Sequence, residues 1–336
     1  MTATSVPEGK IHLHIDNSTD LGPVFEVSQE RLDAALDHYP DVADRLHCTI
    51  DYDCENFDAH AATAEALVCW KIDLSNLEER APNLKWIHVT GAGIDYFTPF
   101  DWLPDGVTFT NNRGVHGERA NEYTIMAVLM LNNRIPEMVT SQREGVWRKA
   151  FNTGIAGKTL MVVGVGHVGG GVAEKAKLFG MKVIGIRRTE GTHPSVDEMH
   201  GPEAIPDLIP QVDYIIVTAP STVDTQHLIG AKEIEMMRPG SGLVNYSRAQ
   251  LVDYEALRMR LETKGDIAAI LDVFDPEPLP EDSPLWNTPN LIITPHCSSD
   301  DSDLYIPRTL DLFFDNMRLY LAGQQLRNVV DPVLEY

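Results

Sequence analysis

The chain has 336 residues, enough for two domains of ordinary size, and 43% of them are hydrophobic, as in a typical globular protein. Its 50 acidic and 27 basic residues give a net charge of −23, which disfavours nucleic acid and anionic membrane as partners. The sequence contains no apolar run long enough for a membrane span, no apolar signal core in MTATSVPEGK and no CxxC pair among its four cysteines. We therefore expect a cytoplasmic protein with reduced thiols.

The N-terminal part alternates between predicted strands and helices, the pattern of a small α/β domain. Ser28 is a plausible N-cap for a helix that ends before Pro40. The predicted strands are Lys10–Asp16, Cys48–Tyr52, Ala66–Trp70 and a further strand within Asn83–Phe97 that enters a glycine turn.

Two features of this part are candidate sites. His12 and His14 share one face of the first predicted strand, but no third metal ligand is nearby. We therefore expect solvated or hydrogen-bonded histidines and no metal. In the glycine turn, Ala92 and Gly93 either present backbone N–H groups to a carboxylate or form a plain strand-to-helix turn.

The middle of the chain begins with a strongly apolar segment, Asn121–Asn132, which is predicted to be a helix. The polar segment Arg134–Thr153 follows and contains the isolated Trp147. This segment is either an arm that lies on another subunit or a surface helix with a loop.

Residues Lys158–Thr189 have the pattern strand, glycine turn, helix, strand, which is one βαβ unit. In its G-x-G-x-x-G turn the first glycine permits the tight turn, the second lets a pyrophosphate approach, and the third allows close packing of helix on strand. The N-terminus of the helix also attracts phosphate groups. The turn residues predicted to bind a dinucleotide are Gly164, Gly166, His167, Val168 and Gly169.

The alternation continues to the C-terminus and predicts a doubly wound parallel sheet, in which ligands bind at the carboxyl ends of strands. A final helix is predicted over Leu304–Leu321. The further predicted strands are Asp213–Ala219, Gly242–Tyr246, Ile267–Phe274 and Leu291–Thr294, and the residues predicted to contact the cofactor near their ends are Ala219, Pro220, Thr225 and Tyr246.

Polar residues at these strand ends form a chemically coherent set. Arg248 offers a planar fork for a carboxylate. His296 can exchange a proton near neutral pH, and Glu277 could hold its imidazolium form. With a nicotinamide cofactor, these residue types suit the reduction of a 2-oxo acid. Taken singly, each is also compatible with an ordinary surface or ion-pair role.

Four motifs in this order resemble the D-isomer-specific 2-hydroxyacid dehydrogenase family over nearly the whole chain. They are GVGHVGGGVAEKAKLFGMKV, NYSRAQLVD, ILDVFDPEPLP and NLIITPH. The resemblance implies Arg248 as the substrate-binding arginine, His296 as the acid/base and Glu277 as its partner. It also implies Asp272 near the nicotinamide, and Ala92 and Gly93 as backbone donors to the substrate carboxylate.

The resemblance also implies a fold with two Rossmann-like domains, the nucleotide-binding domain being inserted into a discontinuous, flavodoxin-like substrate domain. The expected boundaries are 1–115 plus 300–336 for the substrate domain and 116–299 for the dinucleotide domain. It further implies a homodimer through the nucleotide domain and a cleft that closes on substrate.

The sequence departs from the NAD-using members of the family at one informative point. They carry an acidic residue at the end of the second strand of the βαβ unit, whereas this chain has Arg187, Arg188 and Thr189. Two guanidinium groups and a hydroxyl can clamp a 2′-phosphate, which predicts a preference for NADP(H), with NAD(H) as the alternative.

We therefore expect an NADPH-dependent reductase of a small 2-oxo acid such as glyoxylate or hydroxypyruvate. Glu277 argues against formate as the substrate, because the formate-oxidising branch of the family lacks this glutamate. The alternative is a non-catalytic, cofactor-sensing protein of the same fold, like the corepressors of the family.

Overall fold

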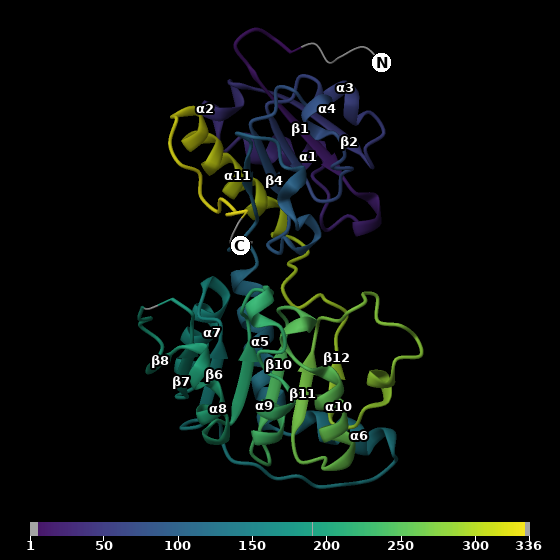
Figure 1. The fold of residues 1–336 in the computed structure, drawn as a ribbon, viewed down its shortest axis with the longest axis vertical. Coiled ribbons are helices and arrows are strands. Elements are labelled where there is room, and N and C mark those ends of the chain that lie inside the picture. Colours follow the sequence, from purple (N-terminus) through teal and green to yellow (C-terminus); the bar gives the residue numbers. More distant parts are fainter. Residues whose placement is uncertain (1–5, 190, 333–336) are drawn as a thin grey trace. The chain divides into compact units, whose positions relative to one another are not determined.

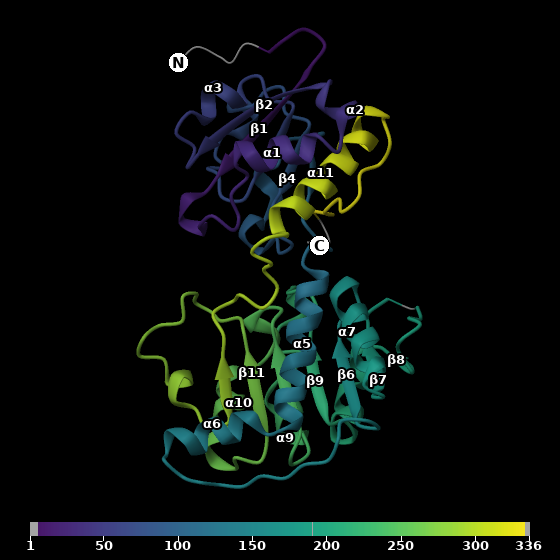
Figure 2. The same cartoon turned by 180° about the vertical axis from the view of Figure 1, so that it is seen from behind.

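The computed structural model describes residues 6–189 and 191–332, and the chain divides into two compact units. The first unit contains the described residues up to His116 and those from Asp301 onward, and the second is Gly117–Asp300 (Figures 1 and 2). In the part of the chain that the structure describes, no helix is both long and apolar enough to cross a membrane.

The sheet of the first unit has five parallel strands in the order β2-β1-β3-β4-β5. This is the strand order of flavodoxin-like folds. Apolar residues fill a core on each face of the sheet. The strands are β1 (Ile11–Asn17), β2 (Leu46–Tyr52), β3 (Ala66–Cys69), β4 (Trp86–Val89) and β5 (Thr108–Thr110). Helices α1 (Gln29–Leu36), α2 (Pro40–Ala43) and α11 (Tyr305–Leu321) cover one face, and α3 (Phe57–Ala61) and α4 (Leu77–Arg80) cover the other.

The second unit has seven parallel strands in the order β12-β11-β10-β9-β6-β7-β8. Six of them reproduce the doubly wound order of dinucleotide-binding folds, and β12 extends it. The order reverses between β6 and β9, where such folds bind their ligand. The strands are β6 (Thr159–Val163), β7 (Lys182–Ile186), β8 (Glu198–His200), β9 (Tyr214–Val217), β10 (Gly242–Asn245), β11 (Ala268–Leu271) and β12 (Leu291–Ile293).

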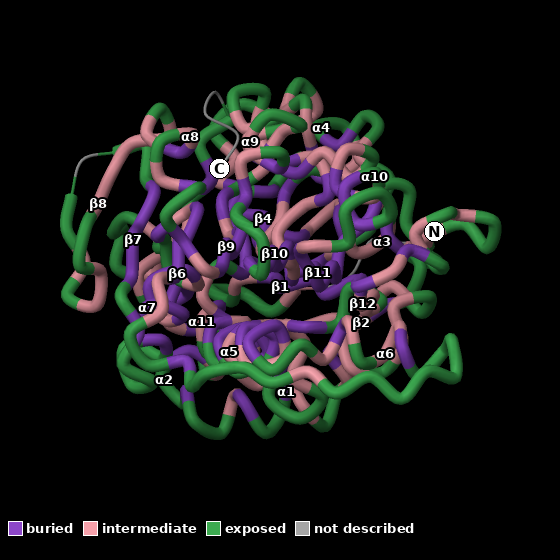
Figure 3. Tube along the Cα trace, turned by 90° about the horizontal axis from the view of Figure 1, so that it is seen from below, coloured by how far each residue is buried: buried purple, intermediate pink, exposed green. Residues whose placement is uncertain are grey.

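Helices cover both faces of this second sheet, and each face has its own apolar core. One face carries α5 (Gly117–Asn132), α6 (Ile135–Arg143) and α7 (His167–Leu178), and the other carries α8 (Ile205–Leu208), α9 (Ala231–Met236) and α10 (Tyr254–Thr263). Figure 3 shows the central strands buried and the connecting loops exposed. Because both faces are covered, the inner strands are continuously apolar, as in the buried run Leu160–Val163.

The predicted fold class, two parallel α/β domains, is confirmed. The sequence did not reveal β5 and β8, whose three residues include only one apolar side chain each, whereas the equally short β12 is entirely apolar and was predicted. The segment after α5 forms the helix α6 and then a loop in which Trp147 is 91% exposed.

The environment of the histidines in the first strand matches only one of the two environments that were expected. His12 and His14 are 1% and 0% exposed, so the expectation of solvated side chains is wrong. The alternative expectation, hydrogen-bonded histidines, is confirmed, because both rings contact the hydroxyl of Thr49.

Candidate active site

The glycine turn after β6 has the geometry that a dinucleotide requires. A Cβ on Gly164 would lie 2.4 Å from the backbone nitrogen of Ala219, and one on Gly169 would lie 2.1 Å from the carbonyl oxygen of Gly164. Both positions therefore exclude any side chain. A Cβ on Gly166 would meet no atom within 4 Å, so this residue faces open space at the start of α7. Open space at a helix N-terminus is the feature to which phosphate groups bind in dinucleotide folds.

The residues predicted to favour NADP(H) over NAD(H) lie immediately after β7. Arg187, Arg188 and Thr189 are all exposed. The backbone N–H of Gly164 donates to the carbonyl of Ile186 at 2.9 Å, so this strand end lies beside the glycine turn. Arg188 Nη1 is 4.0 Å from Asp224 Oδ2, in the loop after β9.

The remaining predicted cofactor residues fall into two groups. Ala219, Pro220 and Thr225 belong to the loop after β9, where the Thr225 hydroxyl donates to the Pro220 carbonyl at 2.9 Å. The ring of Tyr246 instead packs against Tyr123 on α5, with ring centroids 6.4 Å apart. Burial raises the pKa of the Tyr246 hydroxyl. The side chain of Tyr246 therefore belongs to the helix–sheet packing.

His296 and Glu277 form a hydrogen-bonded pair at the carboxyl ends of β11 and β12. His296 Nδ1 is 2.7 Å from Glu277 Oε2, and the other carboxylate oxygen accepts the N–H of Phe274 at 2.7 Å. The bond to Glu277 raises the pKa of His296, although burial opposes this shift. Burial also opposes ionisation of Glu277, but the bonds from His296 and Phe274 lower its pKa overall. The pair therefore favours imidazolium and carboxylate.

Asp272 holds the loop that carries His296. Its carboxylate is fully buried and accepts the Thr294 hydroxyl at 2.5 Å and the N–H groups of Cys297 and Ser298 at 3.3 and 3.1 Å. The N–H of His296 donates to the Asp272 carbonyl at 2.8 Å. These bonds stabilise a backbone that is unfavourable for a residue with a side chain, since His296 has φ +48°.

Arg248 lies beyond the end of β10, the strand next to β11. Its Nη1 donates to the Ser247 carbonyl at 2.7 Å, and its own carbonyl accepts the side-chain amide of Asn245 at 2.9 Å. Its charge contributes to lowering the pKa of both His296 and Glu277, so the three groups share one electrostatic environment. The structure thus brings together the three residues expected to be catalytic.

The turn after β4 in the first unit offers backbone donors. Within residues 6–189 and 191–332, neither the N–H of Ala92 nor that of Gly93 donates a hydrogen bond. The preceding Gly91 is required by Trp70, because a Cβ there would lie 2.1 Å from the indole ring. A pair of free N–H groups in such a turn suits an anion.

Sequence reasoning missed two groups near His296. Thr294 links the Asp272 carboxylate to Tyr123, whose hydroxyl lies 2.7 Å from the threonine oxygen. Asp300 is also close, and burial raises the pKa of its carboxyl to about 6. Neither residue stands out in the sequence, because their roles depend on burial and on contacts between separate segments.

Comparisons with known proteins place the chain among related sequences. The model of the family described as D-isomer specific 2-hydroxyacid dehydrogenase, NAD binding domain, matches residues 125–298. A glyoxylate reductase from Thermococcus litoralis is 34% identical over 244 residues, which are 69% of this chain and 72% of that protein. Glyoxylate/hydroxypyruvate reductase B from Pectobacterium atrosepticum is 30% identical over 313 residues, 88% of this chain and 97% of that protein.

A solved structure extends the similarity to the whole fold. The crystal structure of a D-isomer specific 2-hydroxyacid dehydrogenase from Xanthobacter autotrophicus Py2, in complex with NADPH and MES, is 28% identical with a TM-score of 0.81. The alignment covers 98% of this chain and 100% of that one.

Proposed function

Because this chain belongs to the D-isomer specific 2-hydroxyacid dehydrogenase family and is an NAD(P)-dependent dehydrogenase, we propose that it reduces a small 2-oxo acid of the glyoxylate or hydroxypyruvate type. The observation that carries the proposal is the 2.7 Å contact of His296 Nδ1 with Glu277 Oε2. The charge of Arg248 acts on both members of this pair.

The proton comes from His296. Bound NADPH supplies the hydride to the carbonyl carbon, and the carbonyl oxygen then needs a proton. Since Nδ1 of His296 is held by Glu277, the Nε2–H of the imidazolium is the group that donates. Glu277 keeps the ring oriented and charged. In the oxidative direction the neutral ring takes the proton back.

The substrate carboxylate and carbonyl are bound by groups with matching donors. The Arg248 guanidinium can donate two parallel hydrogen bonds to a 2-oxo acid. The free N–H groups of Ala92 and Gly93 are further donors to the carboxylate.

The cofactor we propose is NADPH, with NADH as a weaker alternative. Gly166 and the N-terminus of α7 bind the pyrophosphate. Arg187, Arg188 and Thr189 bind the 2′-phosphate, because they are exposed beside the glycine turn and no acidic residue takes their place. The similar Xanthobacter autotrophicus Py2 structure is a complex with NADPH.

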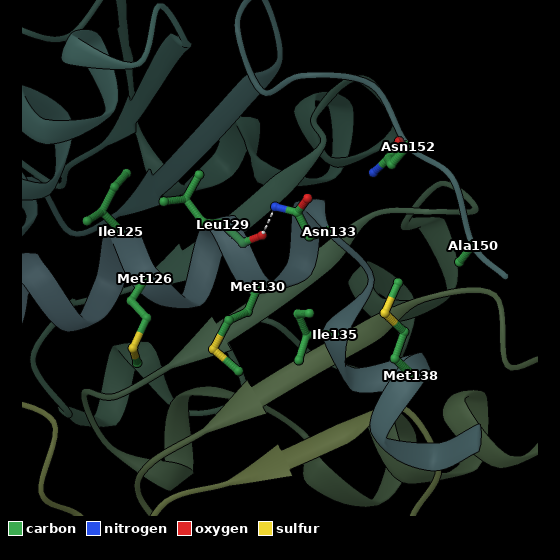
Figure 4. Close-up of a pocket in the computed structure, with 9 residues that line it drawn as sticks. All are labelled: Ile125, Met126, Leu129, Met130, Asn133, Ile135, Met138, Ala150 and Asn152. Atoms are coloured by element: carbon green, nitrogen blue, oxygen red, sulfur yellow. Dashed lines mark hydrogen bonds between the residues drawn. The ribbon is translucent and has the colours of Figure 1, made fainter. Parts of the chain in front are cut away.

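We also infer that the active protein is a homodimer through α5, α6 and the loop that follows them. Figure 4 shows the methionines and isoleucines of α5 and α6 gathered around one hollow of the second unit, lined by Ile125, Met126, Leu129, Met130, Asn133, Ile135, Met138, Ala150 and Asn152. Trp147 and Phe151 in the following loop are 91% and 86% exposed. Apolar side chains grouped in this way favour burial against another protein surface, and a second copy of the chain would bury them.

A panel of 2-oxo acids, assayed with NADPH and with NADH, tests the proposed reaction. We expect turnover with glyoxylate or hydroxypyruvate, and a loss of about 10²–10⁴ in kcat for His296→Ala with NADPH binding retained. Cofactor binding without turnover of any 2-oxo acid would instead favour a cofactor-sensing binding protein.

A further inference from the structure

Six polar residues form a row on one face of the first unit's sheet, and four of them, those on β1 and Asp51, are buried. The parallel register pairs His12 with His47, His14 with Thr49, and Asp16 with Asp51, so alternate residues of β1 and β2 point to the same face. His60 on α3 stacks on His14, with ring centroids 4.9 Å apart. Asp16 and Asp51 are only 2% and 7% exposed. Two carboxylates directly opposite each other on neighbouring strands repel, and burial strengthens the repulsion.

The centre of this row contains two polar atoms without a hydrogen-bond partner. His14 Nε2 and Asp16 Oδ2 are 3.6 Å apart, both side chains are 0% exposed, and neither atom is hydrogen-bonded to any described residue. The separation is too long for a hydrogen bond. It is close to the distance of about 3.4 Å between two ligands of one tetrahedral zinc ion with bonds of about 2.1 Å.

Neighbouring groups hold His14 Nε2 and Asp16 Oδ2 in an orientation that suits metal binding. Thr49 Oγ1 lies 2.9 Å from His14 Nδ1 and 2.8 Å from His12 Nε2, and its single proton can be donated to only one of the two rings. If the hydroxyl donates to His12, His14 donates through Nδ1 and its Nε2 lone pair faces Asp16. Second-shell partners hold metal-binding histidines in this way. The Cys54 N–H donates to Asp16 Oδ1 at 3.1 Å, which leaves Oδ2 for a cation.

The side-chain types and their spacing fit a divalent cation. The potential ligand atoms of His14, Asp16 and Asp51 all lie within 4.8 Å of one another, as do those of His12, His14 and His60.

We propose that His14, Asp16 and Asp51 bind a divalent transition-metal ion in the first unit, with water completing its coordination. The mixed nitrogen and oxygen ligands without thiolate suit Zn²⁺ or Co²⁺. The two carboxylates balance the charge of the ion. The ligands come from β1 and β2, so the ion ties these two strands together. Its role is structural, because none of these residues belongs to the proposed catalytic set.

The test uses full-length protein without a polyhistidine tag, freed of metal with a chelator and titrated with Zn²⁺ by calorimetry. Co²⁺ serves as a spectroscopic probe of nitrogen and oxygen ligation. We expect one ion per chain and a rise in thermal stability on binding. His14→Asn and Asp51→Asn should each weaken Zn²⁺ binding at least about tenfold. The matched control is His88→Asn, a buried histidine of β4 in the same sheet whose Nδ1 contacts Thr110.

Two results would overturn the proposal. One is the absence of saturable Zn²⁺ binding by the wild-type protein, and the other is unchanged binding in the variants. If His14→Asn does not fold, Asp51→Asn decides, because the amide keeps the size of the side chain and one acceptor oxygen. Reductase activity is not a readout of this test, so its outcome is independent of the proposed function.

Discussion

The pKa of His296 depends on opposing influences, which makes the contribution of Glu277 measurable. The bond to the carboxylate raises this pKa above the ordinary value of 6.5, whereas burial and Arg248 lower it. Reduction requires the imidazolium, so its rate should fall as pH rises through the raised pKa. Oxidation requires the neutral ring and should show the opposite dependence.

The first prediction is that Glu277→Gln moves the falling limb of the reduction profile to lower pH. The amide keeps the size of the side chain but removes the charge that favours the imidazolium, so the lowering influences dominate. The measurement is kcat/KM for the 2-oxo acid as a function of pH. Glu281→Gln, an exposed residue of the same loop, is the control and should leave the profile unchanged. A wild-type profile in Glu277→Gln would show that Glu277 does not set the pKa of His296.

The second prediction concerns Arg248→Lys, which keeps the charge. A lysine cannot reproduce the two-pronged guanidinium contact with a 2-oxo acid, so kcat/KM for the 2-oxo acid should fall by about tenfold or more. The KM for NADPH should change little. Arg238→Lys is the control. Arg238 pairs with Asp213, which precedes β9, so this pair lies at the amino end of that strand, whereas Arg248 follows the carboxyl end of β10. Unchanged kinetics in Arg248→Lys would remove this residue from the substrate site.

At the scale of residues, the sequence predicted the polar side chains that follow the ends of strands. It did not predict side chains that come together only through the pairing register of two strands. Arg248, Asp272 and His296 follow successive parallel strands, whose carboxyl ends meet at one edge of the sheet. The row around His14 has no such signal. His60 belongs to a different segment from His14, and Asp51 joins the row only through the pairing of β1 with β2.

At the scale of elements, segments with an apolar run or a long apolar period were predicted, and short segments without one were not. The predicted helices Asn121–Asn132 and Leu304–Leu321 correspond to α5 and α11, with ends that differ by a few residues. Strand β8 was missed because its three residues, Glu198–His200, include one apolar side chain and none of them is fully buried. Its pairing with β7 places it at the edge of the sheet, where hydrogen bonding rather than an apolar pattern defines a strand.

The third prediction belongs to the end of β7. Arg187→Ala should raise the KM for NADPH by about tenfold to a hundredfold, because a charge-assisted contact contributes about 1.5–3 kcal/mol. The KM for NADH should change little, since NADH lacks the 2′-phosphate. Lys232→Ala, an exposed cation on α9, controls for a general loss of positive charge. Equal effects of Arg187→Ala on both cofactors would contradict the assignment.

At the scale of the whole molecule, assembly is governed by two opposing properties of the chain. The face around α5 and α6 exposes Met126 and Met138 by 44% and 36%, and the following loop exposes Trp147. Burying these side chains favours association. The net charge of −23 on each chain opposes it. Salt screens charge repulsion but does not weaken apolar contacts, so the proposed dimer should become tighter as the salt concentration rises.

The fourth prediction follows from this balance. Light scattering should give a mass of two 37.4 kDa chains, and the dissociation constant should fall between about 0.15 M and about 1 M salt, as the screening length shortens from about 8 Å to about 3 Å. Met126→Glu should shift the protein to single chains, because it places a charge within the apolar face. Leu178→Glu, at a residue of α7 that is 80% exposed, adds the same charge elsewhere and should leave the mass unchanged. A single-chain mass for the wild type at high salt, or a dimer unaffected by Met126→Glu, would exclude this face as the interface.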